Sequence, residues 1–227
     1  MKIFRNILLF VTFFSSESIE AQPRFSLSTD VSVLHNFDTK QKFTVVGQTI
    51  IPQFHFDKKN TGYIWFTYHS NGKYKSTLNA TAKSASTSPP SYNFTNQSEM
   101  RLRQFSVGLK RFIKGGYDDL AKFNIYTTAG FGLIIGGASN TFPASVDTSL
   151  YSIQNNIMNG SGDFKRLTFD LGGGLEFPVS YEIYIYSEIR IHIPTTSYPN
   201  NYLLKNSNAP FVGTFNFGIR VSFSADP

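Results

Sequence analysis

The sequence lacks cysteine, and it lacks any apolar run long enough to cross a membrane as a helix. The first absence excludes disulfides, thiolate metal sites, a cysteine nucleophile and a lipid anchor on cysteine. The second excludes helical membrane spans, which need about 20 consecutive apolar residues. The net charge of +6 is modest and scattered. No basic stripe or known motif indicates nucleic-acid binding.

The N-terminus has the pattern of a secretory signal peptide. Lys2 and Arg5 precede the short apolar run 7–14, and Ala21 offers a small residue for cleavage before Gln22. We therefore expect a signal peptide over residues 1–21 and a mature domain over residues 22–227.

Strict alternation of apolar and polar residues is the main pattern in the rest of the chain. From Leu167 to Ile193 nearly every odd position is apolar, and the even positions include Asp170, Glu176 and Glu188. A period of two predicts β-strands with one apolar and one polar face. Two such strands joined by the tight turn 179–181 indicate a membrane-spanning hairpin.

The same pattern predicts eight strands in all. The other six lie at about 25–37, 43–56, from residue 62 onward, up to about residue 113, at about 121–136, and at 213–223. Two points stay open. Trp65 and Phe66 compete for the apolar face of the third strand. A count of ten also stays open, since residues 75–82 and 101–104 are candidates to extend strands three and four.

The connections between these strands differ in length in a regular way. Short turns are expected at 57–61, 114–119 and 179–181, whereas long polar segments lie at 73–97, 137–163 and 194–210. The short first connection, 38–42, departs mildly from the pattern. Short periplasmic turns and long outer loops are typical of outer-membrane barrels. We therefore predict an all-β, eight-stranded antiparallel up-and-down transmembrane barrel, with its long loops outside the cell and its termini in the periplasm.

The polar faces of the strands carry glycines and charges of both signs. Glycines suit a crowded, narrow interior, and buried charges must pair with one another. Eight strands enclose just enough room for side chains. We therefore expect a polar network that fills the barrel, made of Asp30, Lys110, Asp170, Glu176, Glu188, Arg190 and Arg220.

Part of this pattern resembles a known family. The glycine-rich segment 170–179, followed by 181–190 with Glu188, resembles the penultimate hairpin of small outer-membrane β-barrel domains. The Ala21-Gln22 start and the last strand ending in Phe223 are similar to the Bacteroidota versions, called PorT-like or OmpA/OmpX-like. The resemblance implies an eight-stranded barrel in the outer membrane, and it implies no activity because such barrels serve many functions.

The histidines give little support for metal binding or catalysis. His35, His55, His69 and His192 do not have metal-ligand spacing, and no cofactor is predicted. His69-Ser70 resembles the His/Ser pairs of barrel-type lipid A deacylases, which need both side chains on one face. Adjacent residues of a strand point to opposite faces. The sequence therefore favours a protein that is not an enzyme.

Our leading hypothesis is an outer-membrane barrel with a filled interior that acts as a structural or binding protein, or as an accessory subunit of an envelope complex. Expected partners are outer-membrane lipid, lipopolysaccharide and a protein of that complex. The loops would bind through aromatic side chains expected to be exposed: Tyr92, Phe94, Phe142 and Tyr151. Two alternatives are a lipid A-modifying barrel enzyme and a soluble secreted barrel that binds an apolar ligand.

Overall fold

The eight predicted barrel strands are present in the structure. A computed structural model describes residues 24–120, 123–204 and 211–223, so the expected signal peptide lies outside the described residues. The barrel strands are β1 (Arg24–Asn36), β2 (Phe43–His55), β3 (Asn60–His69), β5 (Ser91–Lys114), β6 (Asn124–Thr141), β8 (Gly160–Pro178), β9 (Ile183–Pro194) and β10 (Val212–Phe223).

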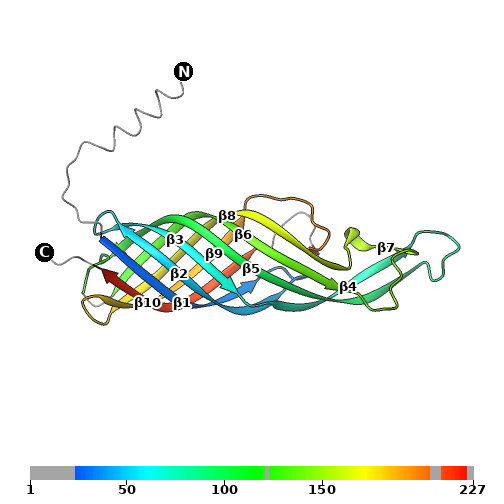
Figure 1. The fold of residues 1–227 in the computed structure, drawn as a ribbon, viewed down its shortest axis with the longest axis horizontal. Coiled ribbons are helices and arrows are strands. Elements are labelled where there is room, and N and C mark those ends of the chain that lie inside the picture. Colours follow the sequence, from blue (N-terminus) through cyan, green and yellow to red (C-terminus); the bar gives the residue numbers. More distant parts are fainter. Residues whose placement is uncertain (1–23, 121–122, 205–210, 224–227) are drawn as a thin grey trace, which may run out of the picture.

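Each barrel strand pairs antiparallel with the next, and the barrel closes where residues 25–36 of β1 pair with the whole of β10 (Figure 1). Phe25 lies opposite Phe223 in this pairing, so the first strand begins where the last strand ends. The predicted closed, eight-stranded antiparallel barrel is confirmed. Among the described residues, no helix is long and apolar enough to span a membrane.

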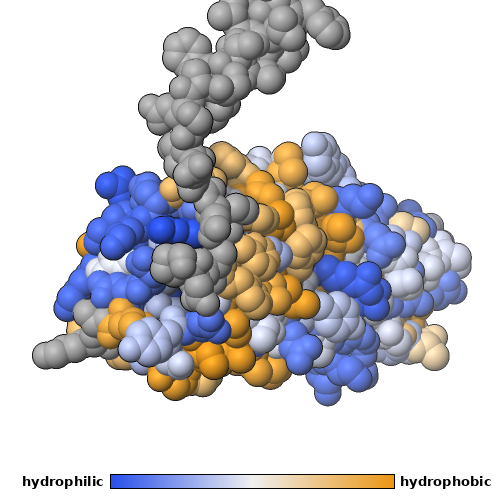
Figure 2. Space-filling view, turned by 60° about the vertical axis from the view of Figure 1, so that its left-hand side comes forward, coloured by the Kyte–Doolittle hydropathy of each residue, from blue (hydrophilic) through white to orange (hydrophobic). Residues whose placement is uncertain are grey.

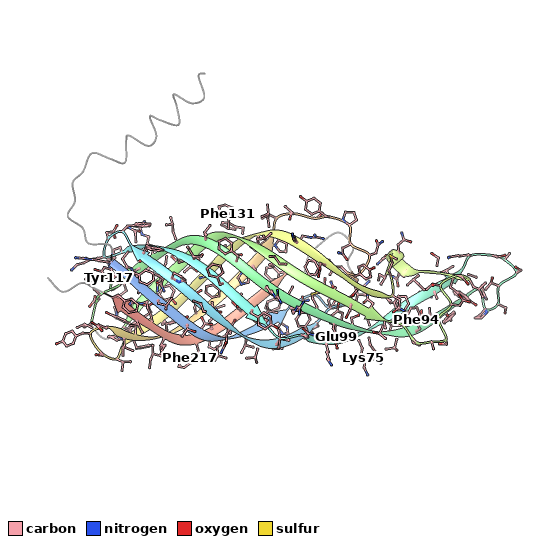
Figure 3. All side chains as sticks on the ribbon, viewed as in Figure 1. Lys75, Phe94, Glu99, Tyr117, Phe131 and Phe217 are labelled. Atoms are coloured by element: carbon pink, nitrogen blue, oxygen red, sulfur yellow. The ribbon has the colours of Figure 1, made fainter. Side chains whose placement is uncertain are left out.

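The apolar face of the strands points outward. Phe131 and Phe217 are 68% and 57% exposed and extend from the barrel wall (Figure 3). Such residues form an apolar band between two polar ends (Figure 2). The open choice in the third strand is also settled, because Trp65 is fully buried inside the barrel whereas Phe66 is exposed. The outer surface is that of a barrel embedded in lipid.

The two ends of the barrel differ. We call the end with the connections β2–β3, β5–β6 and β8–β9 the turn end, and the opposite end the loop end. At the loop end the strands continue into a projection, defined as residues 71–102 and 136–164 (Figure 1). It contains β4 (Gly72–Ala82), the first part of β5, the short strand β7 (Tyr151–Ile153) and the 3-10 turn η1 (Gln154–Asn156).

The long connection 73–97 is therefore not the irregular loop that we expected. It folds as a hairpin in which β4 pairs with residues 91–100 of β5, and β7 adds to the other edge of β4 over residues 80–82. Because β4 lies beyond the barrel, the barrel keeps eight strands. The 24-residue β5 belongs to both parts.

Polarity inverts along β5 where the barrel meets the projection. Between Phe105 and Leu109 the apolar side chains point outward, and their inward neighbours include Gln104 and Lys110. On the projection side of Arg103 most inward side chains are apolar, among them Leu102, Met100 and Phe94, although the buried Asn96 and Ser98 are polar, and the outward ones are mostly polar. The molecule therefore has a polar interior within its apolar band and an apolar core at its loop end.

Candidate functional site

The structure places all seven residues of the expected polar network inside the barrel, each at most 5% exposed. They form separate groups rather than one connected site. In the group nearest the turn end, Glu176 accepts from both Lys110 and Arg220. The Arg220 Nη2 lies 3.0 Å from Glu176 Oε2, and Lys110 Nζ donates to Oε1. One carboxylate thus balances two buried cations.

A second group pairs Glu188 with Arg190, whose Nη2 lies 2.7 Å from Glu188 Oε1. The Arg190 guanidinium also lies 3.7 Å from the centre of the Trp65 ring. A cation over an aromatic face is stabilised electrostatically, more so when water is excluded. Trp65 therefore replaces part of the hydration that Arg190 loses inside the barrel.

The remaining carboxylates have mainly neutral partners. Asp170 Oδ1 lies 3.0 Å from His192 Nδ1, and Ser106 and Gln104 donate to Asp170 Oδ2. Asp30 accepts from the Tyr186 hydroxyl at 2.5 Å. These bonds tie β5 to β8 and β9, and β1 to β9, across the interior.

The histidines do not gather. His55, His69 and His192 face the interior, whereas His35 is on the outer face and lies 2.7 Å from Thr44 Oγ1. Within residues 24–120, 123–204 and 211–223, no three His, Asp or Glu side chains come together as metal ligands. His69 bonds to Ser32 inside the barrel, while Ser70 is exposed, so the two adjacent residues do not form a hydroxyl–imidazole pair.

Side chains fill the middle of the barrel. The polar groups around Lys110, Glu176, Glu188 and Arg190 enclose a cavity of about 10 Å³, which is room for about one water molecule. At the turn end the Tyr117 ring stacks on His55 at 4.1 Å, and the Tyr117 carbonyl accepts from Arg220 at 2.7 Å. Tyr117 thereby covers the interior network from the β5–β6 connection.

An apolar core fills the loop end. It joins inward side chains of the barrel mouth and the projection to the connections that fold over them: Leu34, Phe43, Tyr74, Leu78, Phe94, Met100, Leu102, Ile134, Phe142, Tyr151, Ile153, Ile157, Phe164, Leu203, Leu204 and Val212, with smaller neighbours. Within this core, burial raises the pKa of Tyr74 to about 12. The core closes the second mouth of the barrel.

The expected exposure of the loop aromatics is wrong for three of the four residues. Phe94, Phe142 and Tyr151 are buried, and Tyr92 is half-buried. Phe94 packs edge-on against Phe142, and Tyr92 packs against Tyr151. These rings hold the β4–β5 hairpin to β7 and to residue 142, which directly follows β6, because residues 73–97 form a sheet with an inner face that must be covered.

Sequence reasoning missed Tyr117 and the loop-end core. Tyr117 is a single aromatic residue in a turn, and no periodic pattern marks it. The core carried a readable signal, since Tyr74, Leu78 and Ala80 share one face of a strand with buried positions at a spacing of two.

The fold is that of an outer-membrane β-barrel, and the comparisons with solved structures agree with it. Neisserial surface protein A is 10% identical, with a TM-score of 0.50 over 88% of this chain and 97% of that protein. A major outer membrane protein from Thermus thermophilus is 8% identical, with a TM-score of 0.52 over 88% of this chain and 99% of that protein. No family model and no curated protein sequence matches the chain.

Proposed function

We propose that the chain is a non-conducting outer-membrane barrel that holds its projection outside the cell, where the projection serves as a structural or binding module. The observation that carries this proposal is the filled interior between two covered mouths. Tyr117 covers the turn end, ion pairs fill the middle, and the apolar core fills the loop end. An interior of this kind anchors a protein but leaves no water-filled path for solutes.

The orientation follows from the difference between the two ends. Outer-membrane barrels turn sharply on the periplasmic side and carry their long segments outside. In this chain the sharp turns lie at the end where β1 begins and β10 ends. The turn end would therefore face the periplasm, and the projection would face the surroundings of the cell.

The projection suits a binding role because it is folded and its outer face is polar. Its sheet spans β4, β5, β6 and β8 with an apolar core beneath. We expect partners to contact its outer face and edges rather than the four aromatic residues, which mainly pack on each other. The finer assignment to PorT-like barrels of Bacteroidota remains a prediction from the sequence.

Conductance is the direct test of the proposed function. The purified full-length chain should first show a band that is heat-modifiable in SDS gels, which establishes a folded barrel. In planar bilayers it should then give no stable conductance steps. Tyr117→Gly is the matched variant, since it removes the cover at the turn end but leaves the loop-end core in place. Stable channels from the unchanged protein would overturn the proposal.

Deleting the hairpin tests the binding role. Joining residue 74 to residue 97 through a short turn would remove most of β4 and its partner segment but no barrel strand. The shortened protein should remain a heat-modifiable membrane protein and lose its envelope partners in crosslinking experiments. Retention of every partner and every phenotype would argue against a binding role for this hairpin. A shift in lipid A mass on expression of the gene would instead support the enzyme alternative.

A further inference from the structure

The outer face of β5, β6 and β8 carries three rows of contrasting chemistry at the border of the apolar band. Cross-strand pairing defines each row. Phe105, Leu133 and Leu167 form the last apolar row. Arg103, Ile135 and Lys165 form the next, followed by Arg101, Gly137 and Asp163. Because outward residues on paired strands lie side by side, these rows follow one another across the border.

The middle row sets two cations on either side of an isoleucine. Arg103 and Lys165 are both exposed, and neither forms an ion pair with a carboxylate of the described residues. The Arg103 guanidinium lies 5.4 Å from the ring centre of Tyr68 on β3, on the side of β5 away from Lys165, so its long side chain would turn toward Ile135 to meet a ligand there. Two cations at the edge of an apolar surface are suited to a phosphate held at the same depth.

Above the cations the surface is hollowed. A polar cleft of about 330 Å³ is lined by Glu99, Arg101, Gly137, Ser139, Ser161 and Asp163, with Asn71 and three further neighbours. Gly137 of β6 contributes no side chain to the cleft, whereas Glu99 and Arg101 of β5 and Asp163 of β8 carry longer side chains beside it. Glu99, visible on β5 in Figure 3, is paired with Lys73 at 3.1 Å. The cleft thus offers both hydrogen-bond donors and hydrogen-bond acceptors.

Gly137 is not required by the backbone or by packing. A Cβ added there would meet only Asp163 Oδ1, at 3.2 Å, whereas a Cβ at the neighbouring Gly136 would meet the Phe164 ring at 2.1 Å. The absence of a side chain at residue 137 therefore has one structural effect, which is to keep the cleft open.

We propose that this surface binds a phosphorylated glycolipid of the outer leaflet. Its acyl chains would lie over Leu133 and its neighbours in the apolar row. A phosphate would sit between Arg103 and Lys165, and the sugar hydroxyls would enter the cleft beside Gly137. The order of apolar, cationic and polar rows matches the order of groups in such a lipid. The site rests on the proposed orientation, which directs the loop end to the outer leaflet.

The test is a binding measurement on the purified full-length barrel in detergent micelles, by native mass spectrometry. The probes are bisphosphorylated lipid A, the same lipid after phosphatase treatment, phosphatidylglycerol and inorganic phosphate. The unchanged protein should retain bisphosphorylated lipid A in preference to the other three. Equal retention of the dephosphorylated lipid would overturn the phosphate position, and equal retention of phosphatidylglycerol would overturn the role of the cleft.

Paired variants make the test specific. Arg103→Gln with Lys165→Gln should weaken lipid A binding by about tenfold or more, while Arg111→Gln with Lys114→Gln, which removes two cations near the turn end, should not. Gly137→Trp should block the cleft, and Thr127→Trp on the same face of β6 is its control. If the cation pairs have equal effects, the site is wrong. Because the measurement does not depend on conductance or orientation, its failure leaves the proposed function standing.

Discussion

Glu176 offers the sharpest test of how the interior is stabilised. In Glu176→Gln, Lys110 and Arg220 would remain buried, at most 4% exposed, without their shared carboxylate. Removing one partner of a buried ion pair leaves an uncompensated charge and costs about 3–5 kcal/mol. We expect the free energy of unfolding to fall by an amount in this range, measured by urea unfolding in detergent micelles with far-UV circular dichroism.

The same substitution at the surface is the matched control. Glu99 pairs with Lys73 at 3.1 Å, and these side chains are 42% and 76% exposed. Exposed pairs contribute less than about 1 kcal/mol, so Glu99→Gln should change the free energy of unfolding little. Adding Lys110→Met to Glu176→Gln should recover part of the loss, since only one cation is then unpaired. Equal effects of Glu176→Gln and Glu99→Gln would refute the view that the interior pairs are shielded from water.

Three further predictions concern single contacts. Tyr186→Phe leaves Asp30 without its 2.5 Å hydrogen bond and should cost about 1–3 kcal/mol in the same unfolding assay; no change would mean that water replaces the hydroxyl. Gly72→Ala directs a Cβ to 2.1 Å from the Phe43 ring and should lower the free energy of unfolding by about 1–3 kcal/mol, whereas Gly137→Ala should change it little. A larger loss for Gly137→Ala than for Gly72→Ala would contradict the packing described at the loop end. Phe94→Ala removes a buried ring from the projection and should destabilise it by about 3–5 kcal/mol. Limited proteolysis should then cut residues 83–90 faster while the heat-modifiable barrel persists; unchanged cleavage would show that the hairpin does not depend on this core.

The barrel could be predicted from the sequence because one physical rule governs every strand within the band. Lipid outside and a narrow polar interior impose a period of two, and residues 167–193 follow it with little interruption. The interior charges could be predicted for the same reason. Their grouping could not, because the partners of Glu176 lie on β5 and β10 and depend on the stagger of the strands around the barrel.

The projection was missed although β4 carries a readable spacing of two, because the apolar face of β5 changes sides where the barrel meets the projection. On β5 the apolar residues occupy even positions up to Leu102 and odd positions from Phe105 to Leu109. A search for one continuous apolar face therefore stops at this point and interprets residues 73–97 as a polar loop. The buried position of Phe94 follows from this change of phase on β5, whereas Tyr151 is buried because β7 pairs with β4.

The exchange of the polar and apolar faces along β5 also bears on how deep the barrel lies in the bilayer. If β5 moved inward by two residues, Arg103 would enter the acyl layer at its edge, where a lipid-facing cation costs up to about 1 kcal/mol and more at greater depth. If it moved outward, Phe105 and its row would lose their lipid contact. The order of residues along β5 therefore helps to set the depth of the barrel in the bilayer, with Arg103 at the edge of the apolar band. Other surface modules grafted onto this barrel should be joined on the projection side of Arg103.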